Sequence, residues 1–191
     1  MGALSRRFYG RDPLLVAPDL IGRLLVSDLP AGRVSGRIVE VEAYCGPADP
    51  ASHAYRGRTP RNAVMFGPPG HLYVYFSYGM HHCANVVCEA EASPGAVLLR
   101  AVEPVDGIAL MRERRGGGAD RLLCRGPGRL AQAFGIDLAL NGADLVAGPV
   151  SVRGPARVSG TVAASRRIGI SKATEELWRF YEPGPWASPM R

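Results

Sequence analysis

The chain has 191 residues, 47% of them hydrophobic and 21% charged, which is the ordinary composition of a globular protein. A chain of this length buries a core without needing disulfides, and we predict one domain spanning residues 1–191. Its net charge of +6 favours a polyanionic partner.

The N-terminus and the apolar runs indicate a cytoplasmic protein. The first ten residues, MGALSRRFYG, carry charge and lack the apolar stretch of a signal peptide. The longest apolar run, residues 20–26, is interrupted by Gly22 and Arg23, so it does not approach a membrane span. We therefore expect a monomer in the cytoplasm, with no membrane partner.

The first part of the chain predicts one helix and two strands. An Asp-Pro pair marks the start of a helix over residues 13–21, which Pro18 shortens or kinks. A strand follows over residues 24–29, then a turn at residues 30–32 and a long strand over residues 33–44, in which Val39, Val41 and Ala43 are expected to face a core.

Residues 45–70 are rich in proline, glycine and small side chains. A loop of this length in a compact domain is usually functional. Within it, Thr59 and Pro60 predict the start of a short helix, with threonine as N-cap and proline in the first position.

A protruding β-hairpin is predicted at about residues 71–88. Apolar side chains alternate with aromatic or polar ones along residues 72–77, and Tyr78-Gly79 interrupts the pattern before a second strand. A large aromatic residue at a hairpin tip has little of its own fold to cover it. Either another part of the protein or a partner must therefore cover Tyr78.

The second half mixes strands and helices. A strand is predicted over residues 96–103, a helix over residues 105–115 that ends at three glycines, and a helix over residues 126–134. Residues 136–165 are turn-rich, with short strands.

The chain end predicts a helical turn over residues 172–178 and a strand over residues 179–182. No βαβ rhythm is present, so we predict an α+β fold, a curved and mainly antiparallel sheet with peripheral helices.

A metal site is not favoured by the cysteines and histidines. The spacing Cys83-x4-Cys88 does not match a zinc site, and a chain of this kind is expected to keep its four cysteines as reduced thiols. His81, His82 and Cys83 are consecutive on a strand, so at most two of them share a face. We expect no metal and no cofactor.

Two carboxylates and a tyrosine share one face of the long strand: Glu40, Glu42 and Tyr44. For the glutamates alone, a solvent-exposed strand face is the simpler interpretation. The loop that follows, however, can fold His53 back over the same face. A carboxylate beside aromatic rings is partly desolvated, which raises its pKa and makes it a better base.

Tyr73 and Tyr75 project from the same face of the hairpin strand. They predict either an aromatic cluster in the core or a stacking slot for a flat ligand. Tyr44, His53 and Tyr75 together would form such a slot, in which each stacked base is worth about 1–3 kcal/mol.

Three further side chains are candidates for a nucleic-acid site. Tyr78 can wedge between base pairs and fill the space left by an extruded nucleotide. Asn85 either makes a cross-strand hydrogen bond or, if it lines the slot, selects among exocyclic groups. Arg100 lies in an apolar run, and because an unpaired buried arginine is costly, it should meet Glu42 or a phosphate.

Residues 112–129 hold six arginines. A solvated helix face explains them equally well, but the segment Gly126-Pro127-Gly128 at a helix start would also present free amides to a phosphate. Arg125, Gly126 and Arg129 are therefore candidate phosphate contacts.

Five separate motifs resemble the alkyladenine (3-methyladenine, methylpurine) DNA glycosylase family, and they occur in the family's order. The resemblance extends from about Phe8 to Ser188. The motifs are IVEVEAY (38–44), DPASHAYRGRTPRN (49–62), YVYFSYGMHHCAN (73–85), AVLLRAVEP (96–104) and LCRGPGRLAQAFGI (123–136).

The resemblance implies a mixed α/β domain that binds duplex DNA from the minor groove, flips a damaged purine and cuts its N-glycosidic bond. Glu42 matches the family's general base, and Glu40 matches the other glutamate of that motif, which is not the base. Arg100 matches an arginine close to the water and the target phosphate. Ile168 matches a position whose backbone carbonyl helps to hold the water.

The same resemblance gives roles to the aromatic residues. Tyr44, His53 and Tyr75 match the residues that stack on the flipped base, and Tyr78 matches the residue that intercalates into the duplex. Asn85 matches the residue that screens against the 2-amino group of guanine.

We thus predict an enzyme that acts on double-stranded DNA containing damaged purines, with water as the nucleophile. A lyase would need an amine, and Lys172 is the only lysine. One rival is a non-catalytic binder that uses the tyrosines for stacking and has no need of Glu42. The other rival is a metal-dependent hydrolase built on residues 81–83, which EDTA would inactivate.

Overall fold

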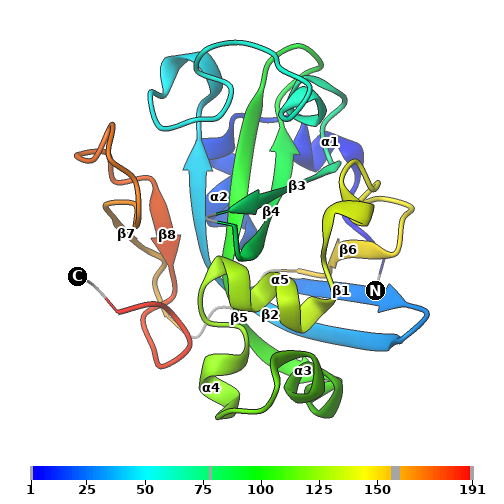
Figure 1. Ribbon diagram of the computed structural model, residues 1–191. Coiled ribbons are helices and arrows are strands. Elements are labelled where there is room, and N and C mark those ends of the chain that lie inside the picture. Colours follow the sequence, from blue (N-terminus) through cyan, green and yellow to red (C-terminus); the bar gives the residue numbers. More distant parts are fainter. Residues whose placement is uncertain (1, 78, 156–159, 190–191) are drawn as a thin grey trace.

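A computed structural model describes residues 2–77, 79–155 and 160–189 and confirms the α+β architecture (Figure 1). The sheet is antiparallel, and its main path runs in the order β3-β4-β5-β2-β1-β6, with β8 beside β2 and β7 beside β8. Its strands are β1 Leu24–Leu29, β2 Gly32–Tyr44, β3 Leu72–Ser77, β4 His81–Cys88, β5 Gly95–Asp106, β6 Val150–Arg153, β7 Ala163–Ser165 and β8 Arg179–Tyr181.

Short helices surround this sheet. The α-helices are α1 Arg6–Tyr9, α2 Pro13–Leu20, α3 Ile108–Arg115, α4 Asp120–Leu123 and α5 Pro127–Phe134, and the 3-10 helices are Gly46–Ala48, Ala63–Phe66 and Leu138–Leu140. In Figure 1, α1 and α2 lie behind the sheet and α5 lies in front of it. None of the helices in the described residues is both long enough and apolar enough to span a membrane.

The strand β2 organises the sheet. β5 runs along one of its edges, while the other edge is shared by β1, which pairs with Gly32–Arg37, and by β8, which pairs with Glu40–Glu42. The β2–β5 register shifts on both sides of Glu40. Such irregularities bend a strand and change the direction of its side chains. At this bend the partner of β2 changes from β1 to β8, and the two glutamates lie on the segment that pairs with β8.

Two clusters of buried side chains hold the fold together. Val41 and Ala43 join the large cluster to which α2 and α5 also contribute, as the strand alternation predicts. The smaller cluster lies beneath the loop that follows β2, and it consists of Ala54, Met65, Tyr73, Val87 and Ala96. Burial of the second cluster fixes the long loop against the hairpin.

The hairpin, the strands β1, β5 and β8, and the helices α2 and α5 lie where the sequence predicts them, although β5 runs longer. The predicted helix over residues 105–115 begins only at Ile108, because β5 continues to Asp106, which pairs with Ser35. Gly107 then reverses the chain with a φ of 73°. The two four-residue helices α1 and α4 were not predicted.

Two predicted helical segments are wrong. The segment at Thr59 forms a turn in which the Asn62 side chain accepts from the Thr59 amide at 2.6 Å, and a 3-10 helix starts only at Ala63. Residues 172–178 form bends and turns, with Ala173 in the left-handed region at φ 48°, which no α-helix accommodates.

Candidate active site

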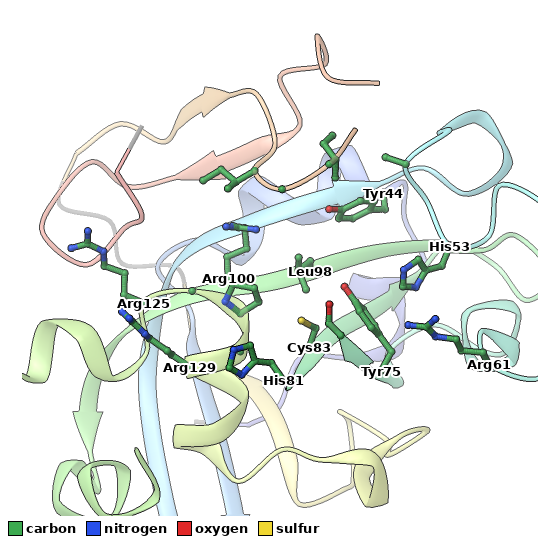
Figure 2. A pocket seen from close by; sticks show the side chains of 18 residues that line it. Tyr44, His53, Arg61, Tyr75, His81, Cys83, Leu98, Arg100, Arg125 and Arg129 are labelled. Atoms are coloured by element: carbon green, nitrogen blue, oxygen red, sulfur yellow. The ribbon is translucent and has the colours of Figure 1, made fainter. Parts of the chain in front are cut away.

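A cavity of about 570 Å³ opens between the hairpin, β5, the start of α5 and residues 168–170 (Figure 2). Most of the residues predicted from the sequence line it: Tyr44, His53, Tyr75, Arg100, Arg125, Gly126, Arg129 and Ile168. Glu42 lies beneath it, and Asn85 borders a smaller adjoining cavity. Tyr78 lies outside the described residues.

Glu42 contacts three residues of the cavity wall. Its Oε1 accepts from the Ile168 N–H at 2.7 Å and lies 3.2 Å from Arg100 Nη1, and its Oε2 accepts from the Tyr44 hydroxyl at 3.0 Å. The side chain is fully buried, and this burial raises its pKa, while the three contacts only partly oppose the increase. A carboxylate held in this state is a stronger base than an exposed one.

Glu40 is equally buried but is surrounded differently. Its Oε1 accepts from Arg100 Nε at 2.9 Å and Arg179 Nε at 2.8 Å, and its Oε2 accepts from the Ser188 N–H at 2.7 Å. Burial alone would raise the pKa of Glu40, but these donors outweigh it and lower the pKa. The solvent-exposed interpretation is therefore wrong for both Glu40 and Glu42, and Arg100 meets carboxylates as predicted.

The predicted aromatic residues meet at one end of the cavity, as Figure 2 shows for Tyr44, His53 and Tyr75. The rings of His53 and Tyr75 lie 4.5 Å apart between centroids, and His53 Nδ1 lies 2.9 Å from the Tyr73 hydroxyl. Burial, with a smaller contribution from Arg61, lowers the pKa of His53. Tyr73 belongs to the buried cluster, as the core interpretation predicts, whereas Tyr75 lines the cavity, where stacking on a flat ligand stays a prediction.

Asn85 makes the cross-strand contact that the sequence allows. Its Nδ2 donates to the Tyr73 carbonyl at 3.1 Å, and only 5% of the residue is exposed. It also borders the smaller cavity beside Tyr44, His53 and Tyr75. The amide is thus fixed in position next to the aromatic residues.

The start of α5 closes the opposite end of the cavity. The Gly126 N–H donates to the Arg100 carbonyl at 2.9 Å. The prediction that this amide is free is therefore wrong. Gly128 leaves no room for a side chain, since a Cβ there would lie 2.8 Å from the His81 ring. Two arginines of this segment, Arg125 and Arg129, line the cavity, and Figure 2 shows them on the side away from the aromatic residues.

The residues beside Ile168 were missed from the sequence. Ile168 reaches Glu42 through its amide N–H, whereas the family resemblance implies a role for its carbonyl. The preceding Arg167 is buried and forms two hydrogen bonds with Asp49, at 2.5 and 2.9 Å. Asp49 lies 118 positions away, so no local pattern joins the two.

The remaining candidates lie apart from this chemistry. Lys172 is exposed and is absent from the cavity lining. All four cysteines are free thiols, and the described part of the chain holds no group of three His, Cys, Asp or Glu side chains arranged for a metal.

Comparison with known proteins identifies the family of the chain. Residues 7–185 match the family described as Methylpurine-DNA glycosylase (MPG). A protein of Rhodopseudomonas palustris (strain BisB18), named "Putative 3-methyladenine DNA glycosylase", is 54% identical over 177 residues, which cover 93% of this chain and 86% of the relative. Proteins of the same name from Streptomyces avermitilis and Carboxydothermus hydrogenoformans are 50% and 49% identical, over 98% and 93% of this chain and 92% and 94% of their own lengths.

Proposed function

Because the chain belongs to the methylpurine-DNA glycosylase family, and is therefore a DNA repair hydrolase that cleaves N-glycosyl bonds, we propose that it removes alkylated or deaminated purines from double-stranded DNA. We assign this activity to one domain acting as a monomer in the cytoplasm. The observation that carries the proposal is the buried Glu42, whose raised pKa suits a base, directly beneath an aromatic-lined cavity.

The damaged purine has to leave the duplex to reach this cavity. A stacked base exposes neither its faces nor its glycosidic bond, so enzymes of this kind turn the nucleotide outward. The cavity volume of about 570 Å³ lies within the usual range for small-ligand sites, about 300–1,000 Å³. Tyr44, His53 and Tyr75 supply the stacking surfaces, and Tyr78 would fill the space that the base leaves.

Bond cleavage then uses one water molecule. Glu42 accepts a proton from this water, the water oxygen bonds to the sugar C1′, and the electron pair of the C1′–N bond leaves with the purine. A cationic alkylated purine thereby leaves as a neutral base, whereas a deaminated purine leaves as an anion and takes up a proton from the solvent. The position that fits the water lies between Arg100 and Ile168, which line the cavity and contact the carboxylate. The carboxylate also stabilises the positive charge that develops on the sugar. The products are a free purine and an abasic site.

The aromatic slot and the Asn85 amide beside it select among bases. An alkylated purine with a positive charge leaves easily and stacks well on electron-rich rings. The Asn85 amide, fixed by its bond to the Tyr73 carbonyl, would clash with the 2-amino group of guanine. Normal pairs also resist extrusion more than damaged ones.

DNA backbone contacts are assigned to the start of α5. Arg125 and Arg129 flank the cavity, and the amide end of a helix favours a phosphate. Since Gly126 already donates to the Arg100 carbonyl, the two arginine side chains carry most of this contact.

The central test is the Glu42→Gln variant on duplex oligonucleotides that each carry one lesion: 3-methyladenine, 7-methylguanine, hypoxanthine or ethenoadenine. We expect base release to fall by at least about 10²–10⁴-fold, the contribution of a general base. Binding to an abasic-site duplex should persist. The control is Glu113→Gln, an exposed glutamate on α3. Near-normal release by Glu42→Gln would contradict the assignment.

We further propose that the enzyme forms no covalent intermediate with DNA. The single lysine, Lys172, is exposed and outside the cavity lining, so no lysine amine is available for a Schiff base. Borohydride added during turnover should trap no protein–DNA adduct, and EDTA should leave the rate unchanged. A trapped adduct would overturn this part of the proposal.

A further inference from the structure

We propose that Arg167 is a positioning residue that locks the base slot to the general base, so that the hydrogen bond from Ile168 to Glu42 depends on the slot being correctly formed. This inference rests on the proposed function. It concerns a residue that does not touch the substrate but acts through Tyr44, Asp49 and Ile168.

Arg167 joins two distant parts of the chain. Its guanidinium donates to both carboxylate oxygens of Asp49, at 2.5 and 2.9 Å, and to the Ala43 carbonyl at 3.0 Å. Ala43 ends the inward-facing row of β2, and Asp49 lies in the first turn of the loop that carries His53. One side chain thereby fixes where β2 stops and where the slot loop begins.

The same guanidinium contacts two aromatic rings. Its Cζ lies 4.7 Å from the centroid of the Tyr44 ring and 4.9 Å from that of Trp178. Arginine packs well against such rings because its group is flat and weakly hydrated. The contact orients the Tyr44 ring, which lines the cavity, and therefore also the Tyr44 hydroxyl that donates to Glu42.

The backbone after Arg167 makes the second contact with Glu42. The Ile168 N–H donates to Glu42 Oε1 at 2.7 Å. With the Arg167 side chain held by Asp49 and Ala43, the chain at residue 167 is fixed, and the next N–H is aimed at the carboxylate. Both Tyr44 and Ile168 thus reach Glu42 in positions that Arg167 determines.

The burial of Arg167 indicates a role beyond holding the fold together. Its side chain and that of Asp49 are both 0% exposed, and a buried ion pair of this kind gives no more stability than apolar residues of similar size. Its Nε is buried without a hydrogen-bond partner among the described residues. Unsatisfied buried donors are rare and call for an explanation, which the placement of Tyr44 and Ile168 supplies.

The test compares two adjacent arginines. Arg167→Lys keeps the positive charge, but an ammonium group does not span Asp49 and the Ala43 carbonyl while covering two rings. Arg166→Lys is the matched control, because Arg166 is exposed and pairs with Glu175 on the surface. Each protein is mixed in excess with a hypoxanthine-containing duplex, and the single-turnover rate of base release is measured across pH.

We expect Arg167→Lys to lower the plateau rate on the order of 10²-fold, the usual effect of a displaced catalytic contact. The acid limb of the rate–pH profile should move to higher pH, because the Ile168 N–H and Tyr44 hydroxyl both lower the pKa of Glu42. The charged and titratable groups that face Glu42 are Arg100 from β5, Glu40 and Tyr44 from β2, Tyr75 from β3, and Arg167 itself. Because Arg167→Lys keeps the positive charge near Glu42, a shift of the acid limb in this variant reports the displaced hydrogen bonds and not the loss of a charge.

Asp49→Asn is the second variant, and it decides the question if Arg167→Lys fails to fold. It should shift the acid limb in the same direction, and the double variant should be no slower than the slower single one. A lower plateau with an unmoved acid limb in these variants would show that Arg167 serves only the fold and would overturn the inference. If wild type and Arg166→Lys release no base from any lesion, the proposed function itself fails, and this outcome is distinct because it does not involve residue 167.

Discussion

The two glutamates of β2 make a controlled comparison within one molecule. Glu40 and Glu42 lie two residues apart on the same strand face, and both are 0% exposed. Glu40 receives Arg100, Arg179 and the Ser188 N–H, all of which hold its charge, and its pKa is lowered. Glu42 receives one arginine at 3.2 Å with two neutral donors, and its pKa is raised.

The difference shows that burial does not by itself determine what a carboxylate does. Both side chains lose the water that stabilises their charge. Two guanidinium groups stabilise the charge of Glu40 more than one guanidinium group stabilises that of Glu42. Arg100 lies between the glutamates and contacts both, so it links the ion cluster of Glu40 to the proposed general base. The raised pKa of Glu42 costs stability, which is the pattern that the proposed catalytic role requires.

The two glutamates should differ most in how much each contributes to the free energy of unfolding. Glu40→Gln should lower the free energy of unfolding by about 3–5 kcal/mol, because it leaves buried Arg179 and Arg100 without a full counter-charge. Glu42→Gln should change it by less than about 1 kcal/mol or increase it, because the charge it removes is unfavourably placed. Urea denaturation of both variants at neutral pH measures the two values. Equal losses would mean that the two glutamates are equivalent to the fold.

Next in size is the loss of the Tyr44 hydroxyl. In Tyr44→Phe the slot wall remains, but Glu42 loses a hydrogen bond of 3.0 Å. Hydrogen bonds to charged groups contribute about 1.5–3 kcal/mol, so base release at mildly acidic pH should fall by about ten-fold or more. The acid limb should shift to higher pH, while Tyr55→Phe, a change at an exposed tyrosine, should leave the profile as in wild type. An unshifted limb would remove Tyr44 from the control of Glu42.

A smaller effect should appear in the pH dependence of stability. The pKa of Glu40 is below its ordinary value of 4.5, so its contribution is present above that value and is lost as the pH falls through the folded-state pKa. The pKa of Glu42 is above 4.5, so its contribution is lost as the pH rises through the folded-state pKa. Each pKa unit corresponds to about 1.4 kcal/mol.

This sign difference is measured by unfolding wild type, Glu40→Gln and Glu42→Gln from about pH 3 to pH 8. Glu40→Gln should lose less stability on acidification than wild type does. Glu42→Gln should lose less on going from acid to neutral pH. Parallel curves for all three proteins would contradict the opposite assignments.

Replacement of the single lysine should not change the rate of base release. Lys172→Arg keeps the charge at an exposed position outside the cavity, so single-turnover base release should equal that of wild type. A strong loss would bring the lysine amine into the reaction and weaken the role given to Glu42.

Local patterns in the sequence were sufficient for most of the strands, for α2 and α5, and for the face on which Glu42 lies. Strand alternation put Val41 and Ala43 in the core, and the Asp-Pro start of α2 is capped as predicted by Asp12, which accepts from the Leu14 N–H at 2.7 Å. The wrong helix predictions also rested on local patterns. The left-handed conformation of Ala173 carries no signature in the residue type, and so the helix predicted there is wrong.

The partners of the site residues required the structure. Glu40 and Arg179 are separated by 139 positions, and Asp49 and Arg167 by 118, so nothing near either residue in the sequence indicates the pairing. The sequence predicts that Arg100 needs a carboxylate or a phosphate, but it does not show that Arg100 would have two carboxylates. The Glu40–Arg179 pair follows from the sheet order, which places β8 beside β2 at the position of the glutamates.

That sheet order has a consequence for the growing polypeptide during synthesis. Glu40 emerges early, but Arg179 and Ser188 follow only 139 and 148 positions later. Until then the shared edge of β2 lacks β8, and a carboxylate destined for the interior keeps its water. A nascent chain that folds from its N-terminus can close the early sheet, but it cannot dehydrate this carboxylate. The ion cluster around Glu40 therefore closes only after β8 and Ser188 have been made.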